Sequence, residues 1–319
     1  MSARRPRPAP HIAALCAGVS LVFLLLLSAP ARSQGEGARA YILGPLPSQA
    51  LNVYGMFGRG NASFNPGSVV AAGGEVDVDG GIIEYAHSFA LAGKAGSWLV
   101  SLPFGEAIRS ISIGSASHTD SRSGIGDMQL TAAFGLLGSP ALSEKDYETY
   151  RPRFAVSLLS RLYIPTGEYD RNSPVNLGQN RWALQLGLPL AYYFGESFSD
   201  PSLTSLELIP SVIWYGDNNE PASGNHSSQA PLMQLEGHWT RNLNESWWVA
   251  LDSIFIQGGE TTTDGVSDHN RQRSFALGAT ASVAVSDAVS ATLSYTQEVS
   301  RNNTGVGGRA IRLLAEFSL

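Results

Sequence analysis

Charged side chains in this sequence fall repeatedly on the polar side of segments in which apolar and polar residues alternate. Arg312 and Glu316, for example, alternate with Ile311, Leu313 and Phe317. A period of two places such charges on one face of an extended strand. On a wet inner face they could form ion pairs that stiffen the structure, or a polar constriction that selects solutes by size and charge. Parity alone does not separate these two interpretations. The lumen-lining candidates are Asp127, Arg153, Arg161, Arg181, Glu236, Asp252, Arg312 and Glu316.

No residue pattern in the sequence indicates catalysis. The histidines in the strand-rich part are scattered, with no two at the spacing of metal ligands, and there is no Gly-x-Ser-x-Gly elbow. No motif for binding a nucleotide, a phosphate or a metal occurs. We therefore expect a protein that is not an enzyme and that needs neither a cofactor nor a metal. The histidines are His87, His118, His226, His238 and His269.

The clearest positioning element is the alternating stretch from residue 275 to residue 299. A turn at Asp287-Ala288 divides it, so the pattern predicts a hairpin of two long strands with one apolar and one polar face. In a soluble sandwich the apolar face would meet another sheet. In an outer-membrane barrel it would meet lipid, and the polar face would line the lumen. For the barrel, we predict that Leu186, Leu277 and Val283 face lipid, whereas Arg181, Thr280 and Ser282 face the lumen.

The composition favours the membrane barrel. Charged residues make up 15% of the 319 residues, and glycine reaches 34, whereas a typical soluble domain is about a quarter charged. Cys16 is the only cysteine, which excludes a disulfide. The formal net charge is -6 and becomes -9 if the arginines at positions 4, 5 and 7 are removed with the N-terminal segment. This acidic balance argues against nucleic-acid binding.

The N-terminus has the three parts of a secretory signal peptide. Arginines precede an uncharged stretch from Ile12 to Leu27, and the small residues Ala29-Pro30-Ala31 follow it. A transmembrane anchor is the alternative, but the stretch is shorter than the roughly 20 residues that a spanning helix needs. We expect residues 1–31 to be cleaved during export to a bacterial outer membrane. A second candidate motif, Ala38-Arg39-Ala40, would move the boundary to residue 40.

Alternating segments continue to the C-terminus and predict an all-β fold, a transmembrane antiparallel β-barrel of about twelve strands over residues 49–319. An even strand number is usual for single-chain bacterial barrels, and about 9–11 residues are enough for a tilted crossing. The predicted strands are 49–58, 76–92, 95–104, 124–137, 152–165, 180–195, 204–216, 230–242, 246–257, 272–286, 289–300 and 309–319. The predicted extracellular loops are 105–124, 139–150, 166–179, 217–229 and 258–271, and the predicted periplasmic turns are 91–96, 243–246 and 287–288.

Several local motifs occur in an order that is found in one known family. Gly124-Ile125-Gly126-Asp127 opens a strand, residues 164–170 end another with Pro-Thr-Gly, and residues 176–182 begin the next. Gly258-Gly259-Glu260-Thr261 follows later. From about Ala38 to the C-terminus, the chain resembles the outer-membrane family named for the meta-pathway of phenol degradation. Members of that family look like transporters that are distantly similar to the long-chain fatty-acid channel.

The resemblance implies a barrel for passive uptake of small hydrophobic or aromatic solutes. Residues 32–48 precede the first strand, and an apolar stretch within them is stiffened by two prolines. We expect this stretch to enter the lumen as a plug and to contact such a solute, with an ordered periplasmic tail as the alternative. The expected partners are outer-membrane lipid, a small hydrophobic solute and the barrel-assembly machinery. The plug candidates are Tyr41, Ile42, Leu43, Pro45 and Pro47.

Two other functions stay open. The first is a structural or adhesive outer-membrane barrel without transport, which a conductance or solute-uptake measurement would separate from a channel. The second is an outer-membrane lipid hydrolase, because outer-membrane phospholipases are also twelve-stranded barrels. Tyr295-Thr296-Gln297 resembles a tripeptide in those enzymes, but no His-x-Ser-Asn-Gly motif follows it here. A lipase assay would identify this enzyme.

Overall fold

The computed structural model describes residues 35–60, 74–113, 116–305 and 307–319. The predicted signal peptide, residues 1–31, lies outside the described residues. Within the described ranges, no helix combines the length and the apolar character needed to cross a bilayer.

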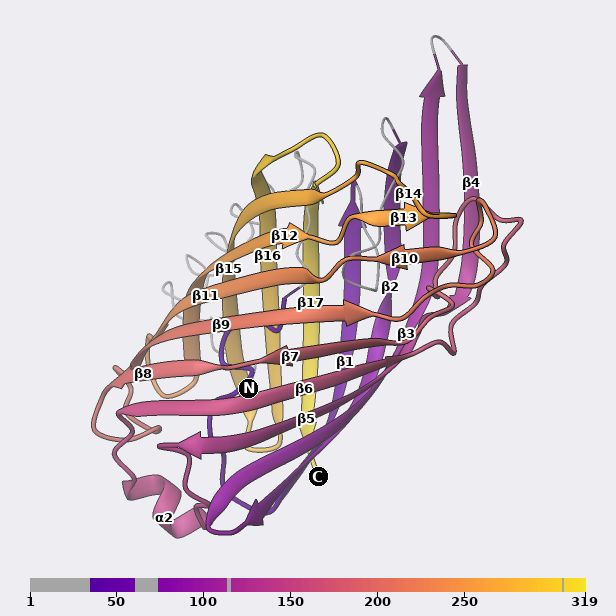
Figure 1. Cartoon of the computed structure of the whole chain (residues 1–319). Coiled ribbons are helices and arrows are strands. Elements are labelled where there is room, and N and C mark those ends of the chain that lie inside the picture. The colour runs from indigo at the N-terminus through magenta and orange to yellow at the C-terminus, as the bar shows by residue number, and fades with distance from the viewer. Residues whose placement is uncertain (1–34, 61–73, 114–115, 306) are drawn as a thin grey trace, which may run out of the picture. The chain divides into compact units, whose positions relative to one another are not determined.

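Strands make up most of the described residues, and there is almost no helix among them (Figure 1). One short helix, α2 (Glu144–Thr149), follows the first third of the chain. The barrel strands are β1 (Ser48–Arg59), β2 (Gly74–Leu91), β3 (Lys94–Ile113), β4 (Ala116–Ile125), β5 (Met128–Leu137), β6 (Phe154–Ile164), β7 (Ala183–Gly187), β8 (Leu190–Phe194), β9 (Thr204–Tyr215), β11 (Leu232–Asn242), β12 (Trp247–Gly258), β15 (Gln272–Ser286), β16 (Val289–Arg301) and β17 (Arg309–Ser318). A separate small sheet contains β10 (Ser227–Gln229), β13 (Thr261–Thr263) and β14 (Val266–Ser267).

The fold is a closed antiparallel barrel of twelve strands, which confirms the predicted fold class. Neighbouring strands pair in chain order, and β17 returns to pair with β1. Two of the twelve positions are each built from two shorter strands. β4 and β5 are separated by Gly126-Asp127, and β7 and β8 by Leu188-Pro189. Pro189 has no amide hydrogen to donate, which explains the break in the second case.

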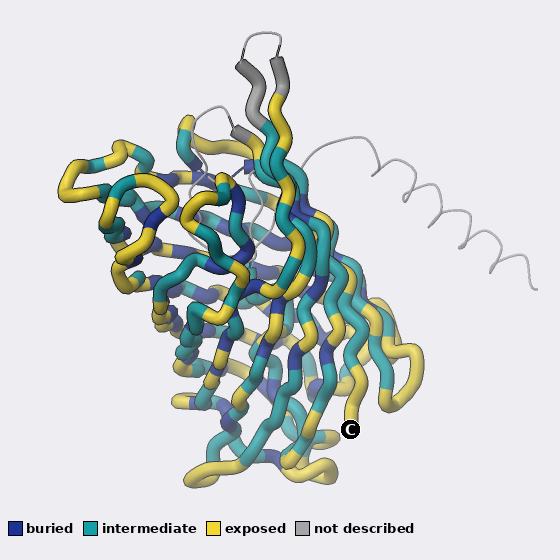
Figure 2. The backbone as a smooth tube through the Cα atoms, turned by 90° about the vertical axis from the view of Figure 1, so that its right-hand side faces the viewer, coloured by how far each residue is buried: buried dark blue, intermediate teal, exposed yellow. Residues whose placement is uncertain are grey.

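The alternation of the sequence becomes an alternation of exposure along the strands (Figure 2). Leu186 and Leu277 are exposed on the outside of the barrel, at 39% and 48%. Thr280 and Ser282 on the opposite parity are buried. Strand pairs therefore place an apolar surface outside and a polar surface inside, as predicted for these positions. Leu186 lies on β7 and the other three on β15.

The two ends of the barrel differ in the length of their connections. The turns around residues 91–94, 243–246 and 287–288 lie at one end, which we call the short-turn end. The connections around 165–182 and 216–231 lie at the other end, which we call the long-loop end. The small sheet of β10, β13 and β14 joins loops at this second end.

The predicted loop at 105–124 is wrong, because most of it is strand. β3 continues to Ile113 and pairs antiparallel with β4, with Arg109 opposite Asp120 and Ile108 opposite Ser121. Figure 1 shows this hairpin extending beyond the other strands at the long-loop end. Outside the apolar belt neither face of a strand meets lipid, so both faces can be polar. High polarity there does not indicate a loop.

The predicted assignment of residues 139–150 to the long-loop end is also wrong. The amide of Ala95 donates to the carbonyl of Ser139, and Ala141 donates to Gly93, so this connection lies beside the β2–β3 turn. It contains α2 and therefore belongs to the short-turn end. The end of the barrel at which a connection lies depends on the direction of the strands that it joins, and not on the length of the connection.

A small apolar core closes part of the short-turn end. Leu43 from the N-terminal segment packs there with Leu142, Tyr193 and Phe198. Tyr147 of α2 stacks on Phe198 with ring centroids 5.1 Å apart. This core fixes the chain just before β1 and so determines where the preceding residues enter the barrel.

Candidate functional site

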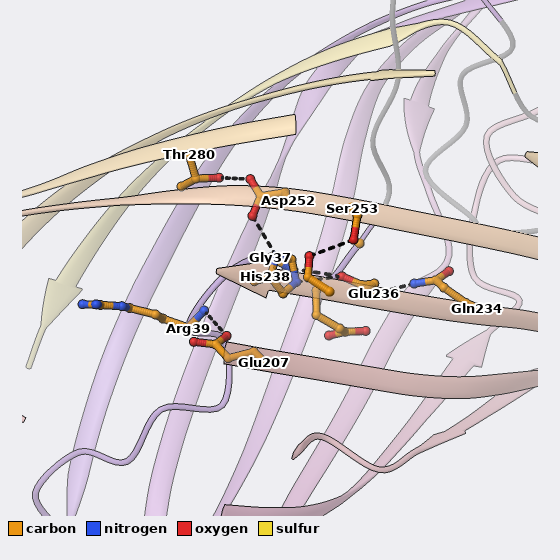
Figure 3. Close-up of polar contacts among 12 residues, drawn as sticks. Gly37, Arg39, Glu207, Gln234, Glu236, His238, Asp252, Ser253 and Thr280 are labelled. Atoms are coloured by element: carbon orange, nitrogen blue, oxygen red, sulfur yellow. Dashed lines mark hydrogen bonds and ion pairs between the residues drawn. The ribbon is translucent and has the colours of Figure 1, made fainter. Parts of the chain in front are cut away.

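The candidate site is the interior of the barrel, where residues 35–42 of the N-terminal segment lie against the inner wall. The contacts come mostly from β6, β7, β9, β11 and β12, which we call the anchor wall. The strands β15, β16, β17, β1 and β2 form the opposite side, which we call the open wall. Figure 3 shows part of the anchor wall around the segment.

Glu36 is the most firmly held residue of the segment. Its two carboxylate oxygens accept from both terminal nitrogens of Arg161 on β6, at 2.8 and 2.7 Å. The Tyr41 hydroxyl donates to the same carboxylate at 2.8 Å, and the Thr131 hydroxyl accepts from Nε of Arg161 at 2.8 Å. The side chains of Arg161 and Glu36 are only 17% and 4% exposed. A two-point guanidinium–carboxylate pair of this kind fixes both position and orientation.

Two glycines allow the segment to pass close to the wall. Gly37 has a φ of 95°, which favours glycine, and its amide lies 3.4 Å from a carboxylate oxygen of Glu236. A Cβ atom at Gly35 would collide with the Glu236 carboxylate, and one at Gly37 with the Arg312 guanidinium. Arg312 donates to the Gly35 carbonyl at 3.0 Å. The lack of a side chain at Gly35 and Gly37 therefore lets the segment lie close to the wall, and charged groups hold it there.

Arg39 makes the next set of contacts along the segment. Its backbone amide donates to Glu207 on β9 at 2.8 Å, and its Nε donates to Thr240 on β11 at 2.9 Å. The guanidinium carbon lies 4.8 Å from the ring centre of Trp248 on β12. Figure 3 shows the Arg39 side chain running away from Glu207 along the wall. The φ of Arg39 is 63°, in the left-handed region that a residue with a side chain rarely adopts.

A buried polar network supports the anchor wall behind the segment. His238 on β11 bonds through Nδ1 to Asp252 on β12 at 2.7 Å, and its Nε2 lies 3.5 Å from Glu236. Gln234 donates to Glu236 at 2.6 Å, and Thr280 donates to Asp252 at 2.7 Å (Figure 3). The Nε2 atom of His238 has no hydrogen-bond partner among the described residues, so the Asp252, Gln234 and Thr280 bonds are the ones that fix these side chains. Glu236 and Asp252 thus act as part of the wall that receives the segment.

Two cavities lie on either side of the segment. One has a volume of about 110 Å³ and extends from the segment past Gln129 and Gln234. The other has a volume of about 460 Å³ and reaches the short-turn end at Asn244 and Ser246. The residues that line both cavities are Glu36, Tyr54, Glu84, Arg161 and Arg312. These residues lie between the two cavities, and we call this set the constriction.

The open wall supplies mainly hydroxyl groups to the larger cavity. Thr280 and Ser294 bond to each other at 2.9 Å, and Thr292 donates to Ser282 at 2.8 Å. Glu84 accepts hydrogen bonds from neutral groups of neighbouring strands, at 2.6 Å in the case of Ser101. The part of this lining that the open wall supplies is therefore mainly polar.

The other predicted lumen residues lie away from the constriction. Asp127 is buried where β4 meets β5 and accepts from the amides of Gly167 and Gln179 at 3.0 and 2.8 Å, so it holds the long loop between β6 and β7. Arg181 contacts Gln229 and lies 4.9 Å from the ring centre of Tyr215, also near the long-loop end.

Arg153 and Glu316 lie neither at the constriction nor at the long-loop end. Arg153 stands just before β6, at the short-turn end, and donates to the Gly195 carbonyl at 3.0 Å. Glu316 on β17 lines the larger cavity together with Glu84. Of the predicted residues, the structure brings together Arg161 and Arg312 at the constriction, and Glu236 and Asp252 beside the segment.

Sequence reasoning missed the two charged residues that hold the segment, Glu36 and Arg39. Neither belongs to an alternating pattern, so no period marked them. It also treated His238 as isolated, although His238 shares the parity of Glu236 two residues before it. That shared parity was a usable signal for the buried network. Of the plug candidates, Tyr41 and Ile42 line the larger cavity, and Leu43 packs at the short-turn end.

The described residues contain no group of three or more histidine, cysteine, aspartate or glutamate side chains that could hold a metal ion. The carboxylates of the site instead bond to guanidinium, amide, imidazole and hydroxyl groups of the protein. The arrangement is therefore one that can hold a peptide segment and present polar groups to a solute.

Comparison with solved structures shows the same fold. The crystal structure of the COG4313 outer membrane channel from Pseudomonas putida F1 aligns with a TM-score of 0.70 and 20% identity, over 90% of this chain and all of that one. The NanC porin and the translocator domain of the autotransporter NalP from Neisseria meningitidis align less well. The NanC porin has a TM-score of 0.44 and 11% identity over 84% of this chain and 100% of that one. The NalP translocator domain has a TM-score of 0.46 and 11% identity, over 96% of this chain and 97% of that one.

Comparison with family models identifies the family. No curated protein matches the chain. The model described as "Putative MetA-pathway of phenol degradation" matches residues 59–313, which is most of the chain and includes the motifs singled out in the sequence. The chain therefore belongs to the MetA-pathway of phenol degradation family.

Proposed function

We propose that this protein is an outer-membrane channel for passive uptake of small solutes, with residues 35–42 serving as a plug that narrows the lumen. The observation that carries the proposal is the constriction, where one segment separates two polar cavities inside a closed barrel. The name of the similar Pseudomonas putida structure, an outer membrane channel, supports the same conclusion.

The membrane location follows from the outer surface of the barrel. Leucine, phenylalanine and tryptophan side chains are exposed there, which suits contact with outer-membrane lipid and insertion by the barrel-assembly machinery. Short turns are typical of the periplasmic end of such barrels. We therefore assign the short-turn end, with α2 and the larger cavity, to the periplasm. The predicted signal peptide would deliver the chain to that compartment.

The lining supports a solute with polar groups. The larger cavity presents hydroxyls from β15 and β16 and carboxylates such as Glu84 and Glu316. Of the apolar plug candidates that were expected to contact a hydrophobic solute, Leu43 instead packs into the core at the short-turn end. Tyr41 and Ile42 still present apolar surface to the cavity, so an aromatic solute with a polar or charged group fits the lining best.

Single-channel recording in planar bilayers tests the proposal. Deletion of residues 35–42 should raise the conductance several-fold over the full-length mature protein, because the constriction loses Glu36. A control is Lys145→Ala on the exposed surface of α2, outside both cavities, which should leave the conductance close to that of the unchanged protein. Heat-dependent mobility in gel electrophoresis would show that each variant has assembled its barrel.

The alternatives predict other results. An absence of conductance and of solute uptake in both the full-length and the shortened protein would favour a structural or adhesive barrel. Equal conductance of the two forms would show that the segment is not a plug. Hydrolysis of phospholipid by the refolded protein would identify an enzyme.

A further inference from the structure

We propose that the pocket holding the Arg39 guanidinium is a binding site for small guanidinium solutes, which compete with Arg39 and release the N-terminal segment. The inference rests on the proposed channel function and adds to it a solute class and a trigger for opening. In the resting state the segment would act as an internal ligand that occupies its own solute site.

The pocket has the parts that recognise a guanidinium group. Thr240 accepts from Nε of Arg39 at 2.9 Å, and the ring of Trp248 lies beside the planar group. Ser205 bonds to Thr240 at 2.6 Å and donates to Glu207 at 2.5 Å, which keeps the Thr240 hydroxyl in place, while Glu207 holds the backbone amide of Arg39. Planar cations stack on aromatic rings and donate to oxygens in their own plane, so this set favours guanidinium over a neutral amide.

Arg39 fits this pocket incompletely. Its Nη2 atom is buried and has no hydrogen-bond partner among the described residues. Its backbone is held at a φ of 63°, a conformation that costs free energy in a residue with a side chain. A free solute carries no such backbone constraint and can turn to place all its nitrogens. A free guanidinium solute can therefore displace Arg39 from this pocket.

The pocket is open to the larger cavity. Arg39 and Trp248 both line that cavity, which reaches the short-turn end. Its lining also includes Glu84, Glu245 and Glu316. Departure of the segment would remove the Arg39 and Glu36 charges together, which leaves the guanidinium pocket open to a solute from the cavity.

Competition at this pocket would be coupled to the constriction. Arg39 follows Glu36 by three residues, so release of Arg39 removes the contact nearest to the Glu36–Arg161 pair. A ligand shifts an equilibrium by the difference between its affinities for the two states. The guanidinium solute binds only when Arg39 has left and therefore favours the released state. The segment is tethered to β1, which gives it an effective concentration of order millimolar, so solutes should act in that range.

Equilibrium binding of agmatine to the refolded full-length barrel tests the inference, with tryptophan fluorescence as the signal. Agmatine and N-propylguanidine should bind saturably, and N-propylurea, the neutral analogue of N-propylguanidine with a similar shape, should not. Arg39→Ala should bind agmatine at least about tenfold more tightly, because the competing side chain is gone and the competent state is populated more fully. Trp248→Phe should lose the fluorescence change, and Thr240→Val should weaken binding when it is measured by calorimetry.

A second measurement follows the segment itself. In an Ala38→Cys variant, agmatine should increase the rate of alkylation by a maleimide, and N-propylurea should not. Unchanged agmatine affinity in Arg39→Ala, or an unchanged alkylation rate at saturating agmatine, would overturn the inference. If deletion of residues 35–42 opens the channel but agmatine does not bind, only this inference fails. If agmatine binds and no form conducts, the channel proposal fails and the binding site stands.

Discussion

The two walls of the lumen are built from the same alternating strands but present different chemistry to the N-terminal segment. The anchor wall offers charged groups that are already oriented by neighbours, such as Arg161 by Thr131 and Glu236 by Gln234. The open wall offers mainly hydroxyls, such as Thr292 bonded to Ser282, and contributes a contact to the segment from Arg312 to the Gly35 carbonyl. The anchor wall thus retains the segment, and the open wall leaves room for a solute.

Retention of the N-terminal segment and passage of a solute therefore depend on different walls of this barrel. A charged pair can hold a segment only if its partners are fixed and shielded from water, which requires close packing. Passage needs weak and exchangeable contacts, which neutral hydroxyls supply. Changes to the anchor wall should therefore alter opening, and changes to the open wall should alter how solutes move once the channel is open.

Breaking the anchor wall should have the largest effect. Arg161→Ala leaves the Glu36 carboxylate buried without its partner, and such a loss costs about 3–5 kcal/mol. Because Glu36 can escape this cost by leaving the lumen, we expect the variant to be open for most of the time in single-channel records. The double variant Glu36→Gln with Arg161→Ala should be more closed than Arg161→Ala alone, because no charge is left unpaired. Equal opening of the two variants would contradict the role of the pair.

The outer and inner faces of β15 should differ in how well they tolerate a charge. Leu277→Arg places a charge in the lipid-facing surface, which costs about 2–4 kcal/mol near the bilayer centre. Thr280→Arg places the same charge in the lumen beside Asp252, where it should be much better tolerated. Heat-resistant folding in lipid, measured by gel mobility, should fall strongly only for Leu277→Arg. A similar loss in both variants would mean that the assignment of the two faces is wrong.

Asp127 tests whether anchoring in the long loops is independent of anchoring in the lumen. Asp127→Ala removes the acceptor of two loop amides, and leaving buried donors unpaired costs about 1–3 kcal/mol each. We expect the loop between β6 and β7 to be cut faster by an added protease, while the segment stays seated and single-channel opening stays unchanged. Increased opening would show that the loop and the segment are coupled.

The smallest expected effect concerns the connection between β8 and β9 at the short-turn end. The backbone amides of Glu196 and Ser202 donate to Asp200, and these hydrogen bonds lower the pKa of its carboxyl below the ordinary value. A lowered pKa means that the stabilisation is present above about pH 4 and is lost as the pH falls through the folded-state value. Protease resistance of this connection should therefore fall slightly on acidification towards pH 3. Asp200→Asn should be less resistant at pH 7 and should change less with pH.

The sequence was sufficient to predict the barrel and its two faces, because a lipid boundary imposes a period of two on every strand that crosses it. It failed where that boundary is absent. The β3–β4 hairpin is polar on both faces and was predicted as a loop, although Arg109 and Asp120 pair across it. Glu36 and Arg39 stand in a segment without a period, and their partners lie more than a hundred residues away in the chain. Only the folded barrel brings such residues together.

The position of the Glu36–Arg161 pair would link the permeability of this protein to the predicted cleavage of its N-terminal segment. Cleavage after Ala31 leaves Glu36 and Arg39 in the mature chain, whereas cleavage after Ala40 removes both. One gene product would then yield two permeability states, which differ by a nine-residue peptide at the N-terminus. The permeability of the envelope would depend on where a protease cuts, before any solute reaches the pore.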